Sequence, residues 1–216
     1  MTKVFLIAGM GADTRIYNRI DIPEKYEVMP VDWIEPNETD TLTTYAQKII
    51  YQYNITQNSI VIGNSLGGML AIEIAKKIRM QKVILISSIK TIDEAPVYYK
   101  YFRAMPVYKL LTDKMLGLIK YFITPVFVPK EKEEIWLFRD MYEKTSKSFL
   151  RWSMGAALHW DNKVIPGNVY HLAGDKDMVF NYKRIKSADI IKSGTHTMIF
   201  DKSKEVNKWL KPILKK

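Results

Sequence analysis

Six short apolar segments, separated by stretches with helical spacing, constrain the fold of this chain more than any other feature. Each is short and largely apolar, which is typical of strands in a parallel sheet that is covered on both faces. The segments are Lys3 to Ala8, Glu27 to Asp32, Ser59 to Gly63, Lys82 to Ser87, Asn168 to Ala173 and Ala188 to Ile191. They predict six parallel strands.

The stretches between these strands carry apolar residues at helical spacing. Asp40 is placed to cap the first predicted helix. Its apolar positions are Leu42, Ala46, Ile49, Ile50 and Tyr53, those of a second helix are Leu66, Leu70, Ile74 and Ile78, and those of the last are Val206, Leu210 and Ile213. Alternating strands and helices predict an α/β fold, a doubly wound and mainly parallel six-stranded sheet.

The alternation is interrupted once, between Thr91 and about Lys163. This stretch lacks a clear buried strand and is dense in Tyr, Phe, Met and Lys, so we expect a helical insertion over the sheet. The predicted organisation is an α/β core from 1–90 and 164–216 with a cap or lid from 91–163. A chain of 216 residues suits one such domain.

The composition excludes several classes of site. The chain contains no Cys, so disulfides, thiolate metal sites and cysteine nucleophiles are excluded. The apolar run in "MTKVFLIAGMGAD" is too short for a signal-peptide core, and no run approaches the roughly 18 apolar residues of a membrane span. We therefore expect a cytoplasmic protein without a membrane span.

The formal charge of +10 is unevenly distributed. Residues 1–60 hold 5 Lys and Arg against 8 Asp and Glu, whereas residues 61–216 hold 28 against 15. Such a surplus serves solubility, or it attracts an acidic partner such as a carrier protein, a phosphorylated ligand or a membrane surface. No zinc-finger, homeodomain or RNA-binding signature accompanies it, so nucleic acid is not an expected partner. Nothing in the sequence indicates an oligomeric state.

A small hydroxyl residue lies between glycines where the third strand gives way to a helix. The stretch is Gly63-Asn64-Ser65-Leu66-Gly67-Gly68. A Gly-x-Ser-x-Gly turn between a buried strand and a helix is the setting of a nucleophile elbow. The glycines let strand and helix approach closely around a strained serine. The alternative is a glycine-rich turn with an incidental serine.

A serine nucleophile needs a base, and the base needs an acid to orient it. Of the three histidines, His196 follows the last strand and is our candidate base. His171 lies inside the fifth strand and is expected to be structural, and His159 is a candidate for lining a pocket. Two candidate acids, Asp175 and Asp177, follow the fifth strand.

Three regions, in this order, resemble the signature regions of the α/β-hydrolase superfamily. They are Gly63 to Gly68, Gly174-Asp175-Lys176-Asp177 and Gly194-Thr195-His196. The resemblance implies that Ser65 is the nucleophile and His196 the base. It also favours Asp177 as the acid, because the family's acid usually stands third after the glycine, although the reverse assignment to Asp175 stays open.

The resemblance also implies an oxyanion hole of two backbone N–H groups. One belongs to Leu66, directly after the nucleophile. The other is assigned to Met10, because Ala8-Gly9-Met10-Gly11 stands where the family has His-Gly-x-Gly. Ala8 in place of the usual histidine, and Asn64 before the nucleophile, depart from the family pattern and leave the shape of the pocket, and hence the substrate, in doubt.

The implied activity is serine hydrolysis of a carboxylic ester or thioester with a small to medium apolar acyl group, through an acyl-enzyme. Carbon–carbon bond hydrolysis or lyase chemistry on the same triad is one alternative, and a non-catalytic ligand-binding protein is another. A third alternative is a dinucleotide-binding site, because "AGMGADT" follows a strand and Asp32 ends the next one. The pattern is incomplete, since Thr14 stands in place of the third glycine. No pair of histidines has metal-ligand spacing, so we expect neither metal nor cofactor.

The predicted cap supplies expectations about the substrate. Its aromatic and methionine side chains are expected to line part of an apolar acyl pocket, and its basic side chains favour an anionic or carrier-bound substrate. The pocket candidates are Tyr98, Phe102, Met105, Tyr121, Phe122, Trp152 and Met154, and the basic ones are Lys100, Arg103, Lys109, Lys114 and Lys120.

Overall fold

The predicted six strands form one sheet. The computed structural model describes residues 1–127 and 132–215, apart from the side chains of residue 120 and residues 122–127. The strands are β1 (Thr2–Ile7), β2 (Tyr26–Val31), β3 (Ile60–Asn64), β4 (Lys82–Ile86), β5 (Val169–Gly174) and β6 (Asp189–Ile191). They pair in the order β2-β1-β3-β4-β5-β6, and every pair is parallel. The predicted fold class is confirmed.

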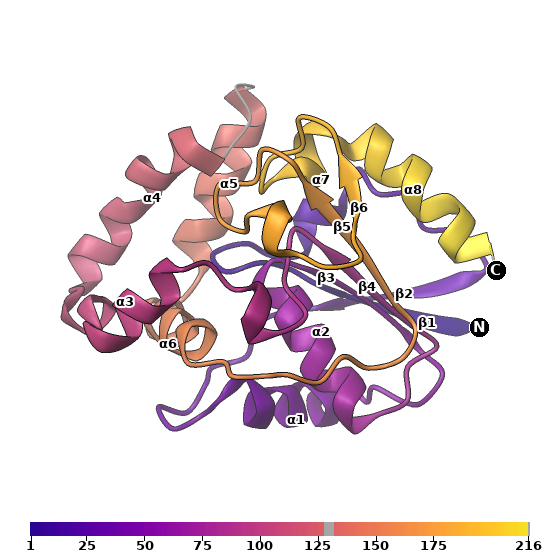
Figure 1. Cartoon of the computed structure of the whole chain (residues 1–216), viewed down its shortest axis with the longest axis horizontal. Coiled ribbons are helices and arrows are strands. Elements are labelled where there is room, and N and C mark those ends of the chain that lie inside the picture. The colour runs from indigo at the N-terminus through magenta and orange to yellow at the C-terminus, as the bar shows by residue number, and fades with distance from the viewer. Residues whose placement is uncertain (128–131, 216) are drawn as a thin grey trace.

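Helices cover both faces of this sheet, as the apolar strands predicted, although the edge strands β2 and β6 are partly exposed instead of fully buried. On one face lie α1 (Leu42–Gln52) and α2 (Leu66–Lys77); on the other lie the 3-10 helix η1 (Thr14–Tyr17), α7 (Met198–Asp201) and α8 (Ser203–Lys215) (Figure 1). Alternate strand residues serve the two faces: Val61 belongs to the apolar cluster of α1 and α2, and Ile62 to that of α8. Because all strands are parallel, their carboxyl ends meet at one edge of the sheet.

Helix α1 begins one residue later than predicted. Its N-cap is Thr41, not Asp40. The Thr41 hydroxyl accepts a hydrogen bond from the Thr44 backbone N–H at 3.2 Å, and the Thr44 hydroxyl accepts one from the Thr41 N–H at 2.9 Å. This reciprocal pair satisfies two backbone donors at the helix start. Asp40 instead accepts from the Asn37 N–H at 2.7 Å and pairs with Lys48.

Residues 91–163, which we call the cap segment, connect β4 to β5. Their described part, 91–127 and 132–163, contains helices and no strand, as predicted. The helices are η2 (Ile92–Glu94), α3 (Tyr98–Ala104), η3 (Val107–Leu110), α4 (Asp113–Phe127), α5 (Lys132–Lys144) and α6 (Lys147–Leu158). They lie beyond the carboxyl ends of the strands, so they lie over the edge where the loops after β1, β3, β5 and β6 converge (Figure 1).

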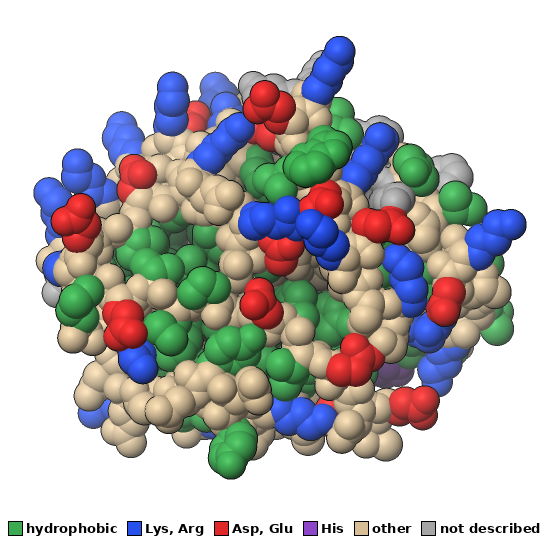
Figure 2. All heavy atoms as spheres, turned by 180° about the vertical axis from the view of Figure 1, so that it is seen from behind, with side chains coloured by type: hydrophobic (Ala, Val, Ile, Leu, Met, Phe, Trp, Pro, Cys, Tyr) green, Lys and Arg blue, Asp and Glu red, His purple; other side chains and the backbone are tan. Residues whose placement is uncertain are grey.

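Basic side chains are concentrated along one edge of the molecule. Helix α8 carries Lys204, Lys208, Lys211 and Lys215 against Glu205, and Lys and Arg side chains project along this edge at the upper left of Figure 2. The apolar stripe of α8 packs on the sheet, so its lysines face solvent. Among the described helices, none combines the length and the apolar character needed to cross a membrane.

Candidate active site

Ser65 is the single residue between a strand and a helix. Strand β3 ends at Asn64 and α2 begins at Leu66. The backbone of Ser65 has φ 52° and ψ −118°, a conformation that residues with a side chain rarely adopt. Its N–H donates to the Ile86 carbonyl at 3.0 Å, and its carbonyl accepts from the Ser88 hydroxyl at 2.7 Å. The neighbouring strand β4 thus holds the strained turn in place.

The glycines around Ser65 are required by close backbone contacts. A Cβ on Gly63 would lie 2.3 Å from the Gly67 carbonyl oxygen. A Cβ on Gly67 would lie 2.3 Å from the carbonyl oxygens of Ile7 and Ala8 in the loop after β1. Both distances are far below a van der Waals contact. Glycine at these two positions therefore lets α2 start against β3 and β1, as the Gly-x-Ser-x-Gly pattern predicted.

The structure brings Ser65, His196 and Asp177 into one hydrogen-bonded row. The His196 Nε2 atom lies 2.9 Å from the Ser65 hydroxyl oxygen. The His196 Nδ1 atom lies 2.9 and 3.1 Å from the two carboxylate oxygens of Asp177. Because a carboxylate only accepts, Nδ1 carries the proton and Nε2 is left to accept the serine proton. Serine, histidine and aspartate come from the loops after β3, β6 and β5.

Asp177 and Asp175 have separate places in the loop after β5. The Asp177 side chain is 1% exposed and accepts hydrogen bonds from the backbone N–H groups of Val179 and Phe180 at 2.8 and 2.9 Å. The Asp175 carboxylate instead accepts from the Ser193 N–H at 2.6 Å. The candidate acid beside His196 is therefore Asp177, while Asp175 ties its loop to the one that carries His196.

A pair of glycines that the sequence analysis left unexplained brings these two loops together. A Cβ on Gly174 would lie 2.1 Å from the Gly194 carbonyl oxygen, so only glycine fits at this crossing. The Lys176 N–H donates to the same carbonyl at 2.9 Å. The signal for this contact is the position of the two glycines: Gly174 is the last residue of β5, Gly194 follows the end of β6 by three residues, and each lies within three residues of a candidate triad member.

Two aromatic rings pack beside the histidine and the aspartate. The Phe180 ring meets the His196 ring edge to face, with 5.5 Å between the ring centroids. The Tyr98 hydroxyl donates to the Val179 carbonyl at 3.3 Å. Burial, together with the nearby charge of Asp177, raises the pKa of Tyr98 to about 12. Tyr98 therefore stays a neutral hydrogen-bond donor at neutral pH.

The two residues predicted for the oxyanion hole flank the serine. Met10, in the loop after β1, and Leu66, the first residue of α2, line the same cavity as Ser65. Neither backbone N–H donates a hydrogen bond within the described residues. The glycine loop that suggested a dinucleotide site packs against this turn: a Cβ on Gly9 would lie 3.2 Å from the Ser65 Cβ. It leads into the four-residue 3-10 helix η1, rather than the long helix of a dinucleotide fold.

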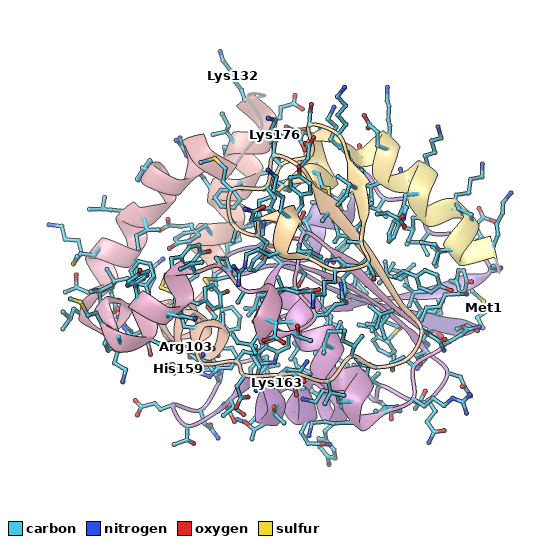
Figure 3. All side chains as sticks on the ribbon, in the orientation of Figure 1. Met1, Arg103, Lys132, His159, Lys163 and Lys176 are labelled. Atoms are coloured by element: carbon cyan, nitrogen blue, oxygen red, sulfur yellow. The ribbon has the colours of Figure 1, made fainter. Side chains whose placement is uncertain are left out.

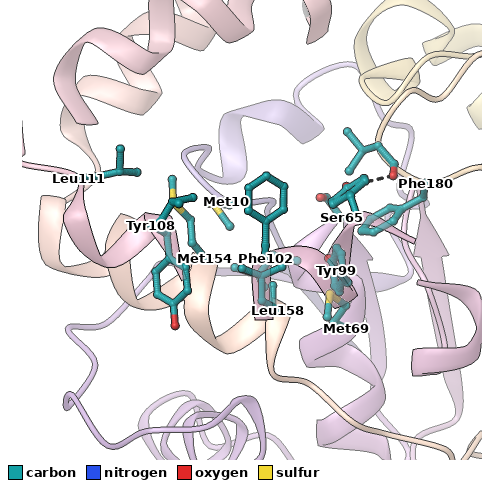
Figure 4. Close-up of a pocket in the computed structure, with 15 residues that line it drawn as sticks. Met10, Ser65, Met69, Tyr99, Phe102, Tyr108, Leu111, Met154, Leu158 and Phe180 are labelled. Atoms are coloured by element: carbon teal, nitrogen blue, oxygen red, sulfur yellow. Dashed lines mark hydrogen bonds between the residues drawn. The ribbon is translucent and has the colours of Figure 1, made fainter. Parts of the chain in front are cut away.

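A cavity of about 320 Å³ opens beside Ser65. None of the 15 described residues that line it is charged (Figure 4). Nine of them belong to the cap segment, and the rest come from the loops after β1 and β5 and from the start of α2. Ser65 and Phe180 lie at one end of the view in Figure 4, while Leu111 and Tyr108 lie at the other. An apolar group attached at Ser65 has room to extend beneath the cap helices.

The prediction of the pocket-lining side chains was partly wrong. Tyr98, Phe102 and Met154 line the cavity, whereas Met105, Tyr121 and Trp152 do not. Met105 and Tyr121 are exposed, and Trp152 packs on α1, where its Nε1 donates to the Asp40 carbonyl at 2.7 Å. The side chains of Phe122 and Lys120 lie outside the described residues.

His159 does not line the cavity of Ser65, and Arg103, in the cap segment as predicted, contacts the backbone at the end of α6. His159 caps the C-terminus of α6 and lines a different hollow, not the cavity of Ser65. Arg103 lies beside it (Figure 3), and its guanidinium donates to the carbonyls of Leu158 and Trp160. Arg103 therefore holds the end of α6. Lys100, Lys109 and Lys114 are exposed but do not line the cavity.

A buried polar cluster lies behind the serine turn. His171 is 3% exposed; its Nδ1 accepts from the Lys90 ammonium at 2.8 Å, and its Nε2 therefore donates to the Ser88 carbonyl at 3.0 Å. Lys90 also pairs with Glu94 at 2.9 Å. Burial, and secondarily the Lys90 charge, lower the pKa of His171 to about 3. His171 has the structural surroundings expected of it, whereas Ser88 and Lys90, in the loop after β4, were missed because no local sequence pattern marks them.

Comparison with known proteins supplies fold relatives. By sequence, the chain matches no protein-family model and no curated protein. Among solved structures, an esterase from Thermogutta terrifontis is similar over 100% of this chain and 90% of its own (TM-score 0.78, 17% identity). An esterase from Exiguobacterium antarcticum (100% and 92%, TM-score 0.75, 19% identity) and the enol-lactonase from Burkholderia xenovorans LB400 (100% and 92%, TM-score 0.76, 12% identity) are also similar. The chain has the α/β-hydrolase fold.

Proposed function

We propose that this chain is a serine hydrolase that cleaves a carboxylic ester or thioester of a small to medium apolar acyl group. The observation that carries the proposal is the 2.9 Å contact between the Ser65 hydroxyl and the His196 Nε2 atom at the mouth of an uncharged cavity. The fold relatives from Thermogutta terrifontis and Exiguobacterium antarcticum, both esterases, support this choice of bond.

In the proposed mechanism, each residue of the row has one role. The Ser65 oxygen attacks the carbonyl carbon while its proton moves to His196 Nε2, and Asp177 orients the ring and stabilises its positive charge. The N–H groups of Met10 and Leu66 stabilise the oxygen anion of the tetrahedral intermediate. His196 then gives the proton to the departing alcohol or thiol. A water molecule repeats the sequence on the acyl-serine and releases the acid.

We assign the cap segment, 91–163, the role of covering the site on the core formed by 1–90 and 164–216. Its contribution of Tyr98, Phe102 and Met154 to the cavity supports this division. Apolar side chains around the acyl group exclude water from the reacting carbonyl, which strengthens the hydrogen bonds to the oxygen anion. Such a pocket favours acyl groups without charge near the carbonyl.

Replacement of the serine tests the proposal. We expect Ser65→Ala to reduce p-nitrophenyl butyrate hydrolysis on the order of 10⁴-fold or more, because triad members act as a unit. A fluorophosphonate probe should label the wild-type chain on the Ser65 peptide and leave the variant unlabelled. Wild-type turnover by Ser65→Ala would overturn the assignment. Tight ligand binding without any turnover would instead favour a non-catalytic protein, and turnover confined to carbon–carbon substrates would favour that alternative chemistry.

The two aspartates give a matched pair for the same assay. We expect Asp177→Asn to lower kcat by roughly 10³ to 10⁴-fold, because an amide beside Nδ1 no longer selects the productive tautomer of His196. Asp175→Asn weakens a loop contact with Ser193 and should keep most of kcat while lowering the melting temperature. A larger loss of kcat in Asp175→Asn would move the acid to Asp175.

A further inference from the structure

A second hollow lies behind the cavity of Ser65, on the other side of helix α6. The first cavity measures about 320 Å³ and the second about 610 Å³. Met154, Ala157 and Leu158 of α6 face the first, while Arg151, Gly155 and other α6 residues face the second. Within the described part of the chain, one residue lines both. It is Tyr108, from the short helix η3.

The ring of Tyr108 lies against α6 at the position where that helix has no side chain. A Cβ on Gly155 would lie 3.0 Å from the Cε2 and hydroxyl oxygen atoms of Tyr108. Glycine at this position therefore lets the ring lie close to the helix. Figure 4 shows Tyr108 distant from Ser65, with its hydroxyl pointing away from the other lining side chains. That hydroxyl makes no hydrogen bond within the described residues. The ring of Tyr108, and not a polar contact, therefore separates the first cavity from the second.

We propose that the Tyr108 ring is the end wall of the substrate pocket and sets the longest apolar group that fits beside Ser65. This inference rests on the proposed function and adds to it a residue that determines specificity. An apolar chain that extends from Ser65 gains contact until it meets the ring. Removing the ring joins the first cavity to the second, which contains polar side chains such as Asp40, Arg151 and His159. The added room then accepts several more carbons before the chain reaches polar surroundings.

The test is a series of straight-chain p-nitrophenyl esters from two to fourteen carbons. In the wild type, kcat/KM should rise by up to about fourfold for each methylene that finds apolar room, and then stop rising at the wall. Tyr108→Ala should move that limit by two carbons or more and raise the ratio of long-chain to short-chain kcat/KM roughly tenfold or more. Tyr108→Leu should produce a smaller shift in the same direction, which keeps the test valid if the alanine variant folds poorly.

Two control variants separate the wall from general effects of mutation. Tyr108→Phe keeps the ring and should keep the wild-type length limit. Lys109→Ala removes side-chain volume from the neighbouring residue, which lines only the second hollow, and should also leave the limit unchanged. An unchanged limit in a well-folded Tyr108→Ala variant, or a shift in Tyr108→Phe equal to that in Tyr108→Ala, would overturn the proposal.

Binding measurements distinguish failure of the wall from failure of the proposed function. Straight-chain carboxylic acids compete with a fluorescent apolar dye in Ser65→Ala and in the double variant Ser65→Ala/Tyr108→Ala. If the double variant alone binds the longer acids more tightly while no ester is hydrolysed by the wild type, the wall stands and the hydrolase proposal fails. If esters are hydrolysed but both proteins show the same length limit, the wall is wrong and the hydrolase proposal stands.

Discussion

The buried His171 makes acid stability a quantitative test of the cluster behind the serine turn. Its pKa is lowered from 6.5 to about 3 by burial and by the Lys90 ammonium at 2.8 Å. Between these two values the unfolded chain binds a proton at this position and the folded chain does not. Titration of His171 therefore does not change the free energy of unfolding above about pH 6.5, and it lowers that free energy progressively as the pH falls towards 3.

The size of the effect follows from the pKa of the unfolded state. At pH 5, which is 1.5 units below the ordinary histidine value of 6.5, protonation favours the unfolded chain by about 2 kcal/mol. We expect the free energy of unfolding of the wild type to fall between pH 8 and pH 5 by about 2 kcal/mol more than that of His171→Gln. Groups shared by both proteins cancel in this difference.

Urea unfolding at pH 8 and pH 5, with constant salt, measures how much the free energy of unfolding of each protein changes between the two pH values. His171→Gln loses stability at both pH values, so the comparison uses only the change with pH. Hydrolysis at pH 8 serves as a control, because a structural His171 predicts that the variant largely keeps its kcat. Equal losses between pH 8 and pH 5 in the two proteins would show that His171 titrates normally in the folded state, and the reasoning from burial would be wrong.

Two further predictions concern the serine turn and the cap. Gly63→Ala places a Cβ 2.3 Å from a backbone oxygen and should prevent folding to a stable protein. Gly117→Ala in α4 places a Cβ that meets no other part of the described structure within 4 Å, and it should be neutral or stabilise by up to about 1 kcal/mol in thermal melts. If the substrate is an anionic or carrier-bound ester, replacing the exposed Lys100, Lys109 and Lys114 with Glu should lower kcat/KM for an anionic ester. Added salt should lower the same kcat/KM in the wild type, because salt screens the attraction between charges over a Debye length of about 10 Å at 0.1 M. A neutral ester of equal length is the control, and an equal salt response by both esters would contradict steering.

The six strands and their alternation with helices could be predicted because both follow from the local sequence. The central strands are buried on both faces and therefore need apolar runs, and all six predicted segments end within about a residue of the observed strands. The turn at Ser65 was also predictable, because a Cβ on Gly63 or Gly67 would lie only 2.3 Å from a backbone oxygen and glycine is therefore required at both positions. Ser88 could not be found this way, because its role depends on β4 lying next to β3, which is a property of the sheet order and not of the local sequence.

The cap was harder to predict, because its helices carry apolar side chains on more than one face. Periodicity identifies such a face but not what it covers. Trp152 and Met154 are two residues apart on α6, and one packs on Tyr45 of α1 while the other lines the cavity. Met105, at the end of α3, is 69% exposed although it is as apolar as Met154. Which methionine lines the cavity is decided by how its helix packs on the rest of the fold.

The two aspartates after β5 show how loop packing assigns chemistry to one of two similar residues. Asp175 follows Gly174 directly, and its backbone N–H donates to Ile191 of β6 while its carboxylate accepts from Ser193. These bonds hold the side chain towards the loop after β6. Two residues later the chain has turned, and Asp177 reaches the His196 ring with its carboxylate already fixed by two backbone N–H groups. A carboxylate held in this way keeps its orientation without help from the histidine. Asp175 therefore ties its own loop to the loop that carries His196, and Asp177 is the carboxylate in position for the proposed role of orienting the base.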